Sequence, residues 1–334
     1  MPQDVHFDIP FPSLISPDAA AARKRNYDWA RAHGLVGSEL AAQRYLSNDI
    51  AGLMARWIPG AVGPDLDVTI DGVIVATLLD DQIDSGLADQ PEEVARICQA
   101  MLSVIRPDAA APRSPSKPLI NAFADVWGRL TQGRTATFCA RTARHWQWYL
   151  DAYVDEAKNR NRAIMPTRAE HFELRRRSGF VYAMMDMTER AYQFEAPELA
   201  WHTPQIQSML TITADVVDTL NDLHSLEKEE GRGDLHNFVL VVQHERRCSR
   251  AEAIAETRDS VHEWIASFIK LTEEIPELCA SLGLTEPERD NVRQLVTGMK
   301  TAMRGYFDWS CKTDRYATTN LVRAGQAAYP HDLL

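Results

Sequence analysis

Oxygen-bearing side chains recur at helical spacing in two distant parts of the chain. Asp80 and Asp84 are four residues apart, so on a helix their carboxylates project from the same face. Asn221, Ser225 and Glu229 repeat every four residues and stay on one stripe of a helix. Carboxylate, amide and hydroxyl oxygens are ligands that Mg²⁺ accepts. The spacing therefore predicts two sets of magnesium ligands, each on the edge of one helix.

Sparse ligand sets of this kind suit a cluster of metal ions and phosphate. Mg²⁺ usually takes few protein ligands and completes its octahedron with water and substrate phosphate. The alternative is that both acidic stretches are solvated helix ends with surface salt bridges. An apolar run at 73–79 precedes Asp80, and Val216 and Leu220 precede Asn221. These runs favour buried helices whose acidic ends meet at a cavity and clamp one diphosphate.

Composition narrows the class of protein further. The chain has 334 residues, 45% hydrophobic and 25% charged, which is ordinary for a globular protein. A net charge of −11 argues against nucleic acid as a partner. The five cysteines are widely spaced without a C-x-x-C pair, which predicts free thiols and a cytoplasmic location. No run of about 18 apolar residues or signal sequence occurs, so we expect no membrane span.

Nearly every long segment has the pattern of a helix. The expected helices cover 17–34, 38–59, 64–86, a short stretch from 91, 118–132, 134–158, 168–195, 204–229, 249–274 and 286–311. A stretch rich in Ala, Pro and Ser at 108–118 predicts a loop, and 237–242 is ambiguous between helix and strand. No repeat or low-complexity linker divides the chain. We therefore predict one all-α domain over 1–334, with about ten or more helices.

Taken together, the motifs resemble those of the bacterial class I terpene synthases, or terpene cyclases, along almost the whole chain. The aspartate-rich motif of that family is matched by 80–84, and its N-D-x-x-S-x-x-x-E motif by 221–229. Its pyrophosphate-sensing arginine is matched by Arg175, and its C-terminal Arg-Tyr pair by 315–316. The opening Met-Pro-Gln-Asp and the segment 307–309 are similar to the pentalenene synthase-like branch. The resemblance implies a class I terpenoid synthase-like helical bundle around a central apolar cavity.

Roles for polar residues follow from the resemblance. The first ligand set would hold two Mg²⁺ ions and the second set a third, with Mn²⁺ able to substitute. Asp81 would pair with Arg315. The residues that would bind diphosphate oxygens are Arg175, Lys228, Arg315 and Tyr316. Guanidinium forks, an ammonium and a phenol suit phosphate oxygens, whereas the run 175–177 alone could be a solvated basic patch.

Three residues would act directly in catalysis, namely Arg175, Gly179 and Trp309. The resemblance places a helix break at Gly179, with its backbone carbonyl facing the substrate, although close packing would explain the glycine equally well. Family members often carry an acidic residue where this chain has Ser178, so the link between Arg175 and the break stays open. Trp309, and more weakly Phe180, would stabilise a carbocation through its aromatic face.

The helix that leads into Asp80 bears on substrate length. Val73, Ala76 and Thr77 lie on the same face as Asp80 and would line the pocket, as would Phe180 and Trp309. Fifteen-carbon cyclases of the family place bulky aromatic residues where this chain has Ala76 and Thr77. The smaller residues free volume worth several methylene groups. We therefore expect geranylgeranyl diphosphate and a cyclic diterpene, with a sesquiterpene cyclase acting on farnesyl diphosphate as the alternative.

The expected reaction is magnesium-dependent ionisation of an isoprenoid diphosphate, cyclisation of the carbocation and release of diphosphate. The enzyme would be a carbon–oxygen lyase of bacterial secondary metabolism. Segments 157–166 and 230–236 would close as a lid, and 312–334 would cap the site beside an N-terminal segment, 1–15. A prenyl chain-elongating transferase and a non-catalytic isoprenoid-binding protein are remote alternatives. Monomer and homodimer are both left open.

Overall fold

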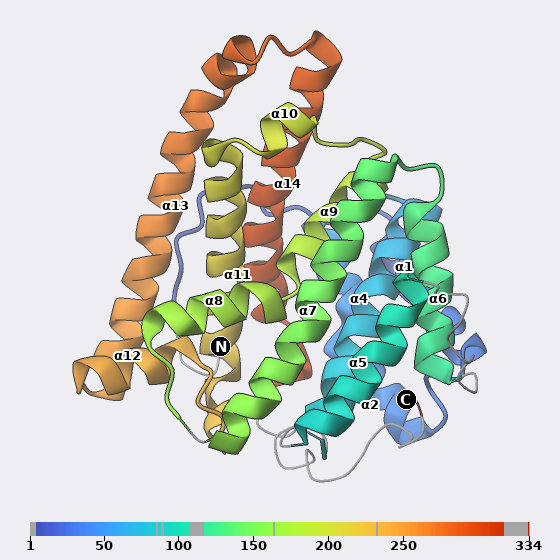
Figure 1. The fold of residues 1–334 in the computed structure, drawn as a ribbon, viewed down its shortest axis with the longest axis vertical. Coiled ribbons are helices and arrows are strands. Elements are labelled where there is room, and N and C mark those ends of the chain that lie inside the picture. Colours follow the sequence, from blue (N-terminus) through green and yellow to red (C-terminus); the bar gives the residue numbers. More distant parts are fainter. Residues whose placement is uncertain are drawn as a thin grey trace.

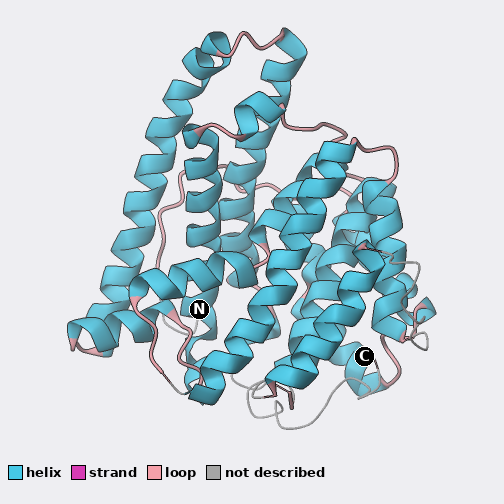
Figure 2. Cartoon of the chain, in the orientation of Figure 1, coloured by secondary structure: helices cyan, strands magenta, loops and turns pink. Residues whose placement is uncertain are grey.

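The protein folds as a bundle of α-helices, seen in a computed structural model (Figure 1). The structure describes residues 5–84, 86–87, 90–106, 117–162, 164–231, 233–316 and 333. These residues form helices joined by loops and contain no strand (Figure 2). The all-α prediction is confirmed.

The chain up to residue 191 supplies nine of the described helices to the bundle. In order they are α1 (Ala19–Ala32), α2 (Glu39–Asn48), α3 (Ile50–Trp57), α4 (Gly63–Asp84), α5 (Pro91–Ile105), α6 (Pro118–Thr131), α7 (Ala136–Arg162), α8 (Arg168–Ser178) and α9 (Val181–Ala191). The second half supplies α10 (Glu198–Trp201), α11 (Pro204–Gly231), α12 (Phe238–Arg246), α13 (Arg250–Ser281), α14 (Glu286–Ser310) and the short 3₁₀ turn η1 (Asp314–Tyr316). The antiparallel pair α13 and α14 extends beyond the other helices at one end (Figure 1).

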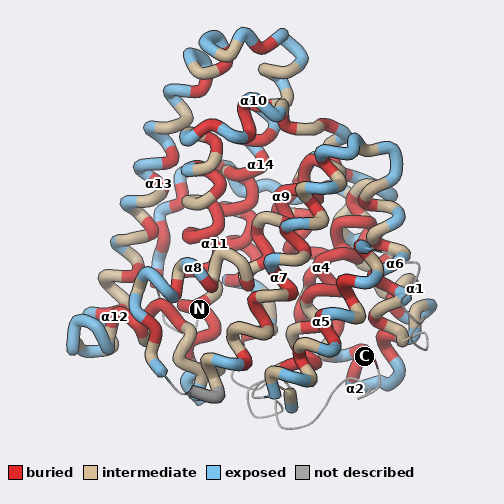
Figure 3. Tube along the Cα trace, viewed as in Figure 1, coloured by how far each residue is buried: buried red, intermediate tan, exposed pale blue. Residues whose placement is uncertain are grey.

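The helices that carry the acidic motifs are among the most buried. Nearly every residue of α4 between Leu66 and Ile83 is buried, as the apolar run predicted. The same holds for α11 from Thr213 to Leu226. Figure 3 shows buried residues concentrated on these central helices, with exposed residues on the outer faces. The two motifs therefore stand at the ends of core helices rather than on the surface.

Two predicted helices are each interrupted in the structure. The expected helix at 38–59 breaks at Asp49, which has a left-handed backbone with φ of 48° and accepts a hydrogen bond from the Gly52 amide as the cap of α3. The expected helix at 168–195 breaks between α8 and α9. Here Phe180 is left-handed, with φ of 65°, while Gly179 has an ordinary helical φ of −71°. A bulky residue in this region is strained, so the surrounding packing holds the break open.

The other helix boundaries differ less from the predicted ones. The ambiguous stretch at 237–242 is helical, because Asn237 accepts a hydrogen bond from the Val239 amide and caps α12. The helix α13 continues through Pro276 to Ser281, and α10 was not predicted. The loop predicted at 108–118 and the capping segment at 312–334 fall mainly on 107–116, 317–332 and 334, outside the described residues.

The N-terminal segment is extended, and its side chains alternate between buried and exposed positions. Phe7, Ile9 and Phe11 are buried, while the residues between them are exposed. The Phe7 ring packs against Phe307 of α14 with centroids 5.8 Å apart. The carbonyl of Ile9 accepts a hydrogen bond from Arg304. The segment therefore packs against α14.

Candidate active site

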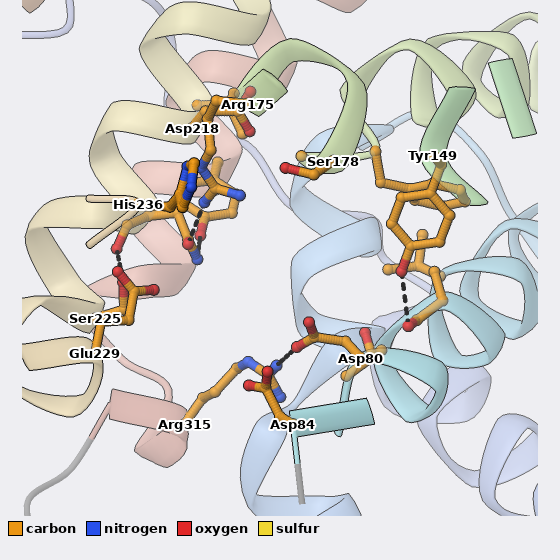
Figure 4. Close-up of a pocket in the computed structure, with 18 of the residues that line it drawn as sticks. Asp80, Asp84, Tyr149, Arg175, Ser178, Asp218, Ser225, Glu229, His236 and Arg315 are labelled. Carbon is orange, nitrogen blue, oxygen red and sulfur yellow. Dashed lines mark hydrogen bonds and ion pairs between the residues drawn. The ribbon is translucent and has the colours of Figure 1, made fainter. Parts of the chain in front are cut away.

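All residues predicted from the sequence to form the site line one pocket. They are Val73, Ala76, Thr77, Asp80, Asp84, Arg175, Gly179, Phe180, Asn221, Ser225, Lys228, Glu229, Trp309, Arg315 and Tyr316. Its walls come from α3, α4, α7, α8, α9, α11, α14 and η1. Figure 4 shows Asp80 and Asp84 on one side, Ser225 and Glu229 on the other, and Arg315 between them. The structure thus brings the two distant ligand sets together.

Direct contacts join the two acidic motifs. The Lys228 ammonium of α11 lies 3.8 Å from an Asp84 carboxylate oxygen of α4. Arg315 of η1 lies 3.2 Å from Asp80 and 3.6 Å from Asp81. The expected pairing of Asp81 with Arg315 is therefore present, and the same guanidinium also contacts Asp80.

The pKa values of the carboxyl groups reflect this crowding. Burial raises the pKa of Asp80, and the nearby Asp84 carboxylate raises it further. Burial, together with Asp222 and Asp234, raises the pKa of Glu229 to about 7. Both shifts show negative charges held close together, an environment that a divalent cation would relieve.

The second motif is held by a dense hydrogen-bond network. Arg175 donates to the Asn221 amide oxygen at 2.6 Å and to Asp222 at 3.0 Å. The Asn221 amide nitrogen donates to the hydroxyls of Tyr306, at 2.8 Å, and Tyr316, at 2.7 Å. This network fixes the Asn221 side chain. It also places Arg175 and Tyr316, both predicted to bind diphosphate, in contact with Asn221, a predicted metal ligand.

The side chains of Glu229 and Ser225 also take part in hydrogen bonds of this network. The Asn237 amide donates to Glu229 at 2.8 Å, and the Ser225 hydroxyl donates to the Asn221 carbonyl at 2.9 Å. Both side chains nevertheless line the pocket. Among the described residues, no three His, Cys, Asp or Glu side chains gather closely enough to hold an ion by themselves. The amide of Asn221 and the hydroxyl of Ser225 supply the further oxygens of the predicted donor set.

The segments predicted to form a lid already touch. Arg160, near the end of α7, donates to the Asp234 carboxylate at 2.8 Å. The same guanidinium lies 3.6 Å from Asp84. Arg160, Asp234 and His236 all line the pocket. They lie in the predicted lid segments, but sequence reasoning assigned them no individual roles because isolated residues carry no spacing signal.

The break between α8 and α9 has an acidic neighbour, but not at position 178. Ser178 lines the pocket, and the carboxylate beside the break belongs to Asp218 of α11. A methyl group on Gly179 would overlap that carboxylate. Burial raises the pKa of Asp218 well above its usual value, and Arg175 opposes the shift. The structure shows both the expected helix break and close packing at Gly179, and the catalytic role of this residue stays a prediction.

Aromatic rings make up much of the apolar wall. Trp309 is 2% exposed, and its indole N–H donates to the Asp49 carbonyl at 2.8 Å. Phe180 packs against Trp146 and Tyr149, with centroids 4.6 and 4.5 Å apart. Tyr149 had no predicted role, because an aromatic residue at helical spacing usually indicates core.

Similarity to known structures defines the class of protein. The crystal structure of α-eudesmol synthase matches with a TM-score of 0.85 and 30% identity, covering 93% of this chain and 100% of that one. Linalool/nerolidol synthase from Streptomyces clavuligerus, in complex with 2-fluorogeranyl diphosphate, matches with a TM-score of 0.81 and 30% identity, covering 92% of this chain and 99% of that one. The fold is that of the bacterial class I terpene synthases.

The sequence comparisons give the family. Residues 71–267 match the model described as terpene synthase family 2, C-terminal metal binding. Pentalenene synthase from Streptomyces avermitilis is 36% identical over 335 aligned positions, covering 100% of this chain and 99% of the relative. The chain belongs to terpene synthase family 2. It is a metal-binding terpene cyclase, a carbon–oxygen lyase that ionises a prenyl diphosphate. No helix among the described residues is long and apolar enough to cross a membrane.

Proposed function

We propose that this enzyme is a sesquiterpene cyclase that converts farnesyl diphosphate into a cyclic product. The observation that carries the proposal is the meeting of the two acidic motifs with four cationic or phenolic side chains in one pocket with aromatic walls. The contact of Lys228 with Asp84 spans the two motifs directly. Such a site can neutralise a diphosphate at one end and shelter a polyene at the other.

The donor set fits divalent cations. Asp80 and Asp84 would hold magnesium on one side, and Asn221, Ser225 and Glu229 on the other, for three ions in all. When bound, Mg²⁺ supplies positive charge that stabilises the departing diphosphate. Burial raises the pKa of Asp80 and Glu229 and neighbouring carboxylates add to both shifts, a crowding of negative charge that a divalent cation would relieve. Oxygen ligands of this kind also accept Mn²⁺.

The cationic side chains of the pocket would bind the diphosphate. In this structure Arg175 contacts Asn221 and Asp222, Arg315 contacts Asp80, and Lys228 lies near Asp84. Each cation therefore rests against an acidic or amide group of the motifs. A bound diphosphate would offer these cations stronger, doubly charged partners, and Tyr316 would add a phenolic donor. Preorganised positive charge of this kind lowers the barrier to C–O cleavage.

The rest of the pocket would guide the carbocation. Trp309 and Phe180 present aromatic faces, and each cation–π contact is typically worth about 0.5–2 kcal/mol. Gly179 lets α8 and α9 approach Asp218 closely and so shapes the wall at the break. Movement of Arg160 and Asp234 on ligand binding would close the lid and exclude water, which would otherwise quench the cation.

The relatives favour farnesyl diphosphate, the alternative substrate, over the geranylgeranyl diphosphate that we expected from the sequence. Relatives across nearly the whole chain are named as farnesyl diphosphate cyclases, including 7-epi-α-eudesmol synthase from Streptomyces viridochromogenes at 33% identity over 95% of this chain. The structure offers a physical reason. Ala76 is small, but Tyr149 of α7 reaches its carbonyl at 2.9 Å. Tyr149 and Ala76 line the same pocket, so a ring from α7 competes with the substrate for volume near Ala76, which favours the fifteen-carbon chain.

Product analysis tests this function. The purified enzyme is incubated with Mg²⁺ and geranyl, farnesyl or geranylgeranyl diphosphate, and products are analysed by gas chromatography–mass spectrometry. We expect the highest kcat/KM and a cyclic product with farnesyl diphosphate, and no turnover after chelation of the metal. Added isopentenyl diphosphate should produce no longer chain. A preference for geranylgeranyl diphosphate would overturn the substrate assignment, and inertness toward all three would overturn the proposed function.

A further inference from the structure

Two tyrosines of α7 contact the helix of the aspartate-rich motif. The Tyr149 hydroxyl donates to the Ala76 carbonyl of α4 at 2.9 Å. One turn further along, the Tyr153 hydroxyl donates to Asp80 at 3.1 Å. The two hydroxyls lie 2.8 Å apart. Figure 4 shows Tyr149 reaching from α7 toward the helix that carries Asp80.

The Tyr149 ring is held firmly in this position. The residue is 3% exposed and lines the pocket. Its ring lies 4.5 Å from that of Phe180 and 4.9 Å from that of Tyr153, measured between centroids. Aromatic contacts on two sides and a hydrogen bond at the tip leave the ring little freedom to rotate away. Tyr149 is therefore a fixed part of the wall rather than a movable side chain.

The place that Tyr149 occupies matters for substrate length. It lies beside Ala76 and close to Thr77, where α4 itself presents only small side chains to the pocket. Farnesyl and geranylgeranyl chains differ by one five-carbon unit, which is similar in bulk to a phenol ring. Loss of such a ring from a packed wall leaves a cavity that neighbouring side chains refill only in part.

We propose that Tyr149 determines the substrate length of this enzyme, by filling from α7 the space that Ala76 leaves open on α4. The inference rests on the proposed sesquiterpene cyclase function and deepens it. The ring sets the limit, and the hydroxyl bond to the Ala76 carbonyl keeps the ring in place. Because the limit comes from α7, the small residues on α4 do not by themselves admit a twenty-carbon chain.

Substitutions at position 149 separate the ring from the hydroxyl. In Tyr149→Ala, we expect the ratio of kcat/KM for geranylgeranyl over farnesyl diphosphate to rise at least about tenfold, as new volume admits the longer chain. In Tyr149→Phe the ring remains, so the ratio should stay within about twofold of wild type. Tyr182→Ala, at a half-buried tyrosine of α9 that does not line this pocket, is the matched control. An unchanged ratio in a folded Tyr149→Ala enzyme would overturn the inference.

A relocation experiment covers the case in which Tyr149→Ala is inactive. Ala76→Phe alone should overpack the wall and lower turnover of farnesyl diphosphate. The double variant Ala76→Phe with Tyr149→Ala should recover turnover and the fifteen-carbon preference, because one ring then replaces the other. Effects that simply add would show that the two positions do not share a space, and would overturn the inference.

Binding measurements and wild-type behaviour complete the test. For any folded but inactive variant, calorimetry with farnesyl and geranylgeranyl thiolodiphosphates in the presence of Mg²⁺ measures a Kd for each chain length. The ratio of the two Kd values then takes the place of the kcat/KM ratio. If Tyr149→Ala does not fold, Tyr149→Leu and the double variant take its place. Wild-type enzyme inert to all diphosphates would refute the proposed function itself. Wild-type turnover of farnesyl diphosphate with an unmoved variant ratio would refute only the role of Tyr149.

Discussion

Buried carboxylates meet basic side chains in several parts of this molecule, and two of these clusters, one between α7 and α9 and one at the pocket, differ in how their charges are paired. Between α7 and α9, Arg141 donates to Asp186 at 3.0 Å and to Glu189 at 2.6 Å. The remaining carboxylate oxygens bond to His145, at 2.7 Å, and to the Ala196 amide, at 2.8 Å. All four carboxylate oxygens of this cluster therefore have partners within it.

The pocket mouth is arranged differently. Asp84 has ion pairs of 3.6 and 3.8 Å, with Arg160 and Lys228 respectively. One carboxylate oxygen each of Asp81 and Asp218 accepts no hydrogen bond from the described residues. A cluster that satisfies its own charges stabilises a fold, whereas one with crowded like charges and long ion pairs is suited to receive a ligand. The contrast predicts that substitutions in the two regions change different properties.

Loss of a predicted metal ligand should have the largest effect. We expect Asp80→Ala or Asn221→Ala to lower kcat/KM about 10³-fold, equivalent to about 4 kcal/mol of transition-state stabilisation. The melting temperature of Asp80→Ala should change little, because this side chain faces the pocket. Diphosphate release and circular dichroism measure the two effects, with the exposed Asp28→Asn as the matched control. Full activity in either variant would refute the metal assignment.

A substitution in the cluster between α7 and α9 should instead lower stability and leave activity unchanged. Arg141→Met leaves Asp186 and Glu189 buried without their shared cation, and breaking such a group typically costs about 3 kcal/mol or more. Urea unfolding would measure the loss. At temperatures where the variant remains folded, kcat/KM should match wild type. Unchanged stability, or a loss of turnover in the folded variant, would contradict the proposed division between the two regions.

The acidity of Glu189 gives a separate test of the cluster between α7 and α9. Burial, opposed by Arg141, raises the pKa of Glu189 from 4.5 to about 7. The folded state therefore holds this proton more tightly than the unfolded state. The resulting stabilisation is fully present below pH 4.5 and is lost as pH rises to about 7. The difference in unfolding free energy between wild type and Glu189→Gln should fall by on the order of 3 kcal/mol from pH 4.5 to 8. A flat difference would contradict the assignment.

A substitution of Gly179, at the break between α8 and α9, should have a smaller effect on activity. In Gly179→Ala the new methyl group displaces the Asp218 carboxylate, and overpacking of this kind costs about 1–3 kcal/mol. We expect a loss of roughly tenfold or more in kcat/KM for farnesyl diphosphate. Adding Asp218→Ala should relieve part of that loss, because the overlapping group is gone. Full activity in Gly179→Ala would show that the close approach is dispensable.

Tyr153→Phe should have the smallest effect. It removes one hydrogen bond to Asp80 and preserves the ring. A net hydrogen bond is worth about 0.5–1.5 kcal/mol, so the Mg²⁺ concentration for half-maximal activity should rise about threefold to fivefold. The ratio of geranylgeranyl to farnesyl turnover should not change. A change in that ratio would assign to Tyr153 the role that we infer for Tyr149.

The sequence was most informative where function depends on spacing along one helix. The ligands on α4 and on α11 follow a four-residue repeat, so each set was predictable, and the structure places both sets in one pocket. Their roles remain predictions. The helical fold was equally predictable, because long apolar patterns and caps determine it locally.

Features that depend on packing between helices were not predictable. Asp49 ends a helix without a glycine or proline, and its left-handed backbone is supported by Arg23 and by Trp309 of α14. Tyr149 could be matched to Ala76 only once α7 and α4 were placed together. The expectation of a twenty-carbon substrate was drawn from α4 alone, and the relatives together with the position of Tyr149 lead us to propose a fifteen-carbon substrate instead.

The left-handed turn at Asp49 has a practical consequence for engineering this enzyme. It redirects the chain so that Ile50 and Leu53 of α3 line the pocket, while its carbonyl anchors the Trp309 indole. A mutant library aimed at new product skeletons can therefore target Ile50 and Leu53. It should keep Asp49 constant, since that one residue orients two walls at once.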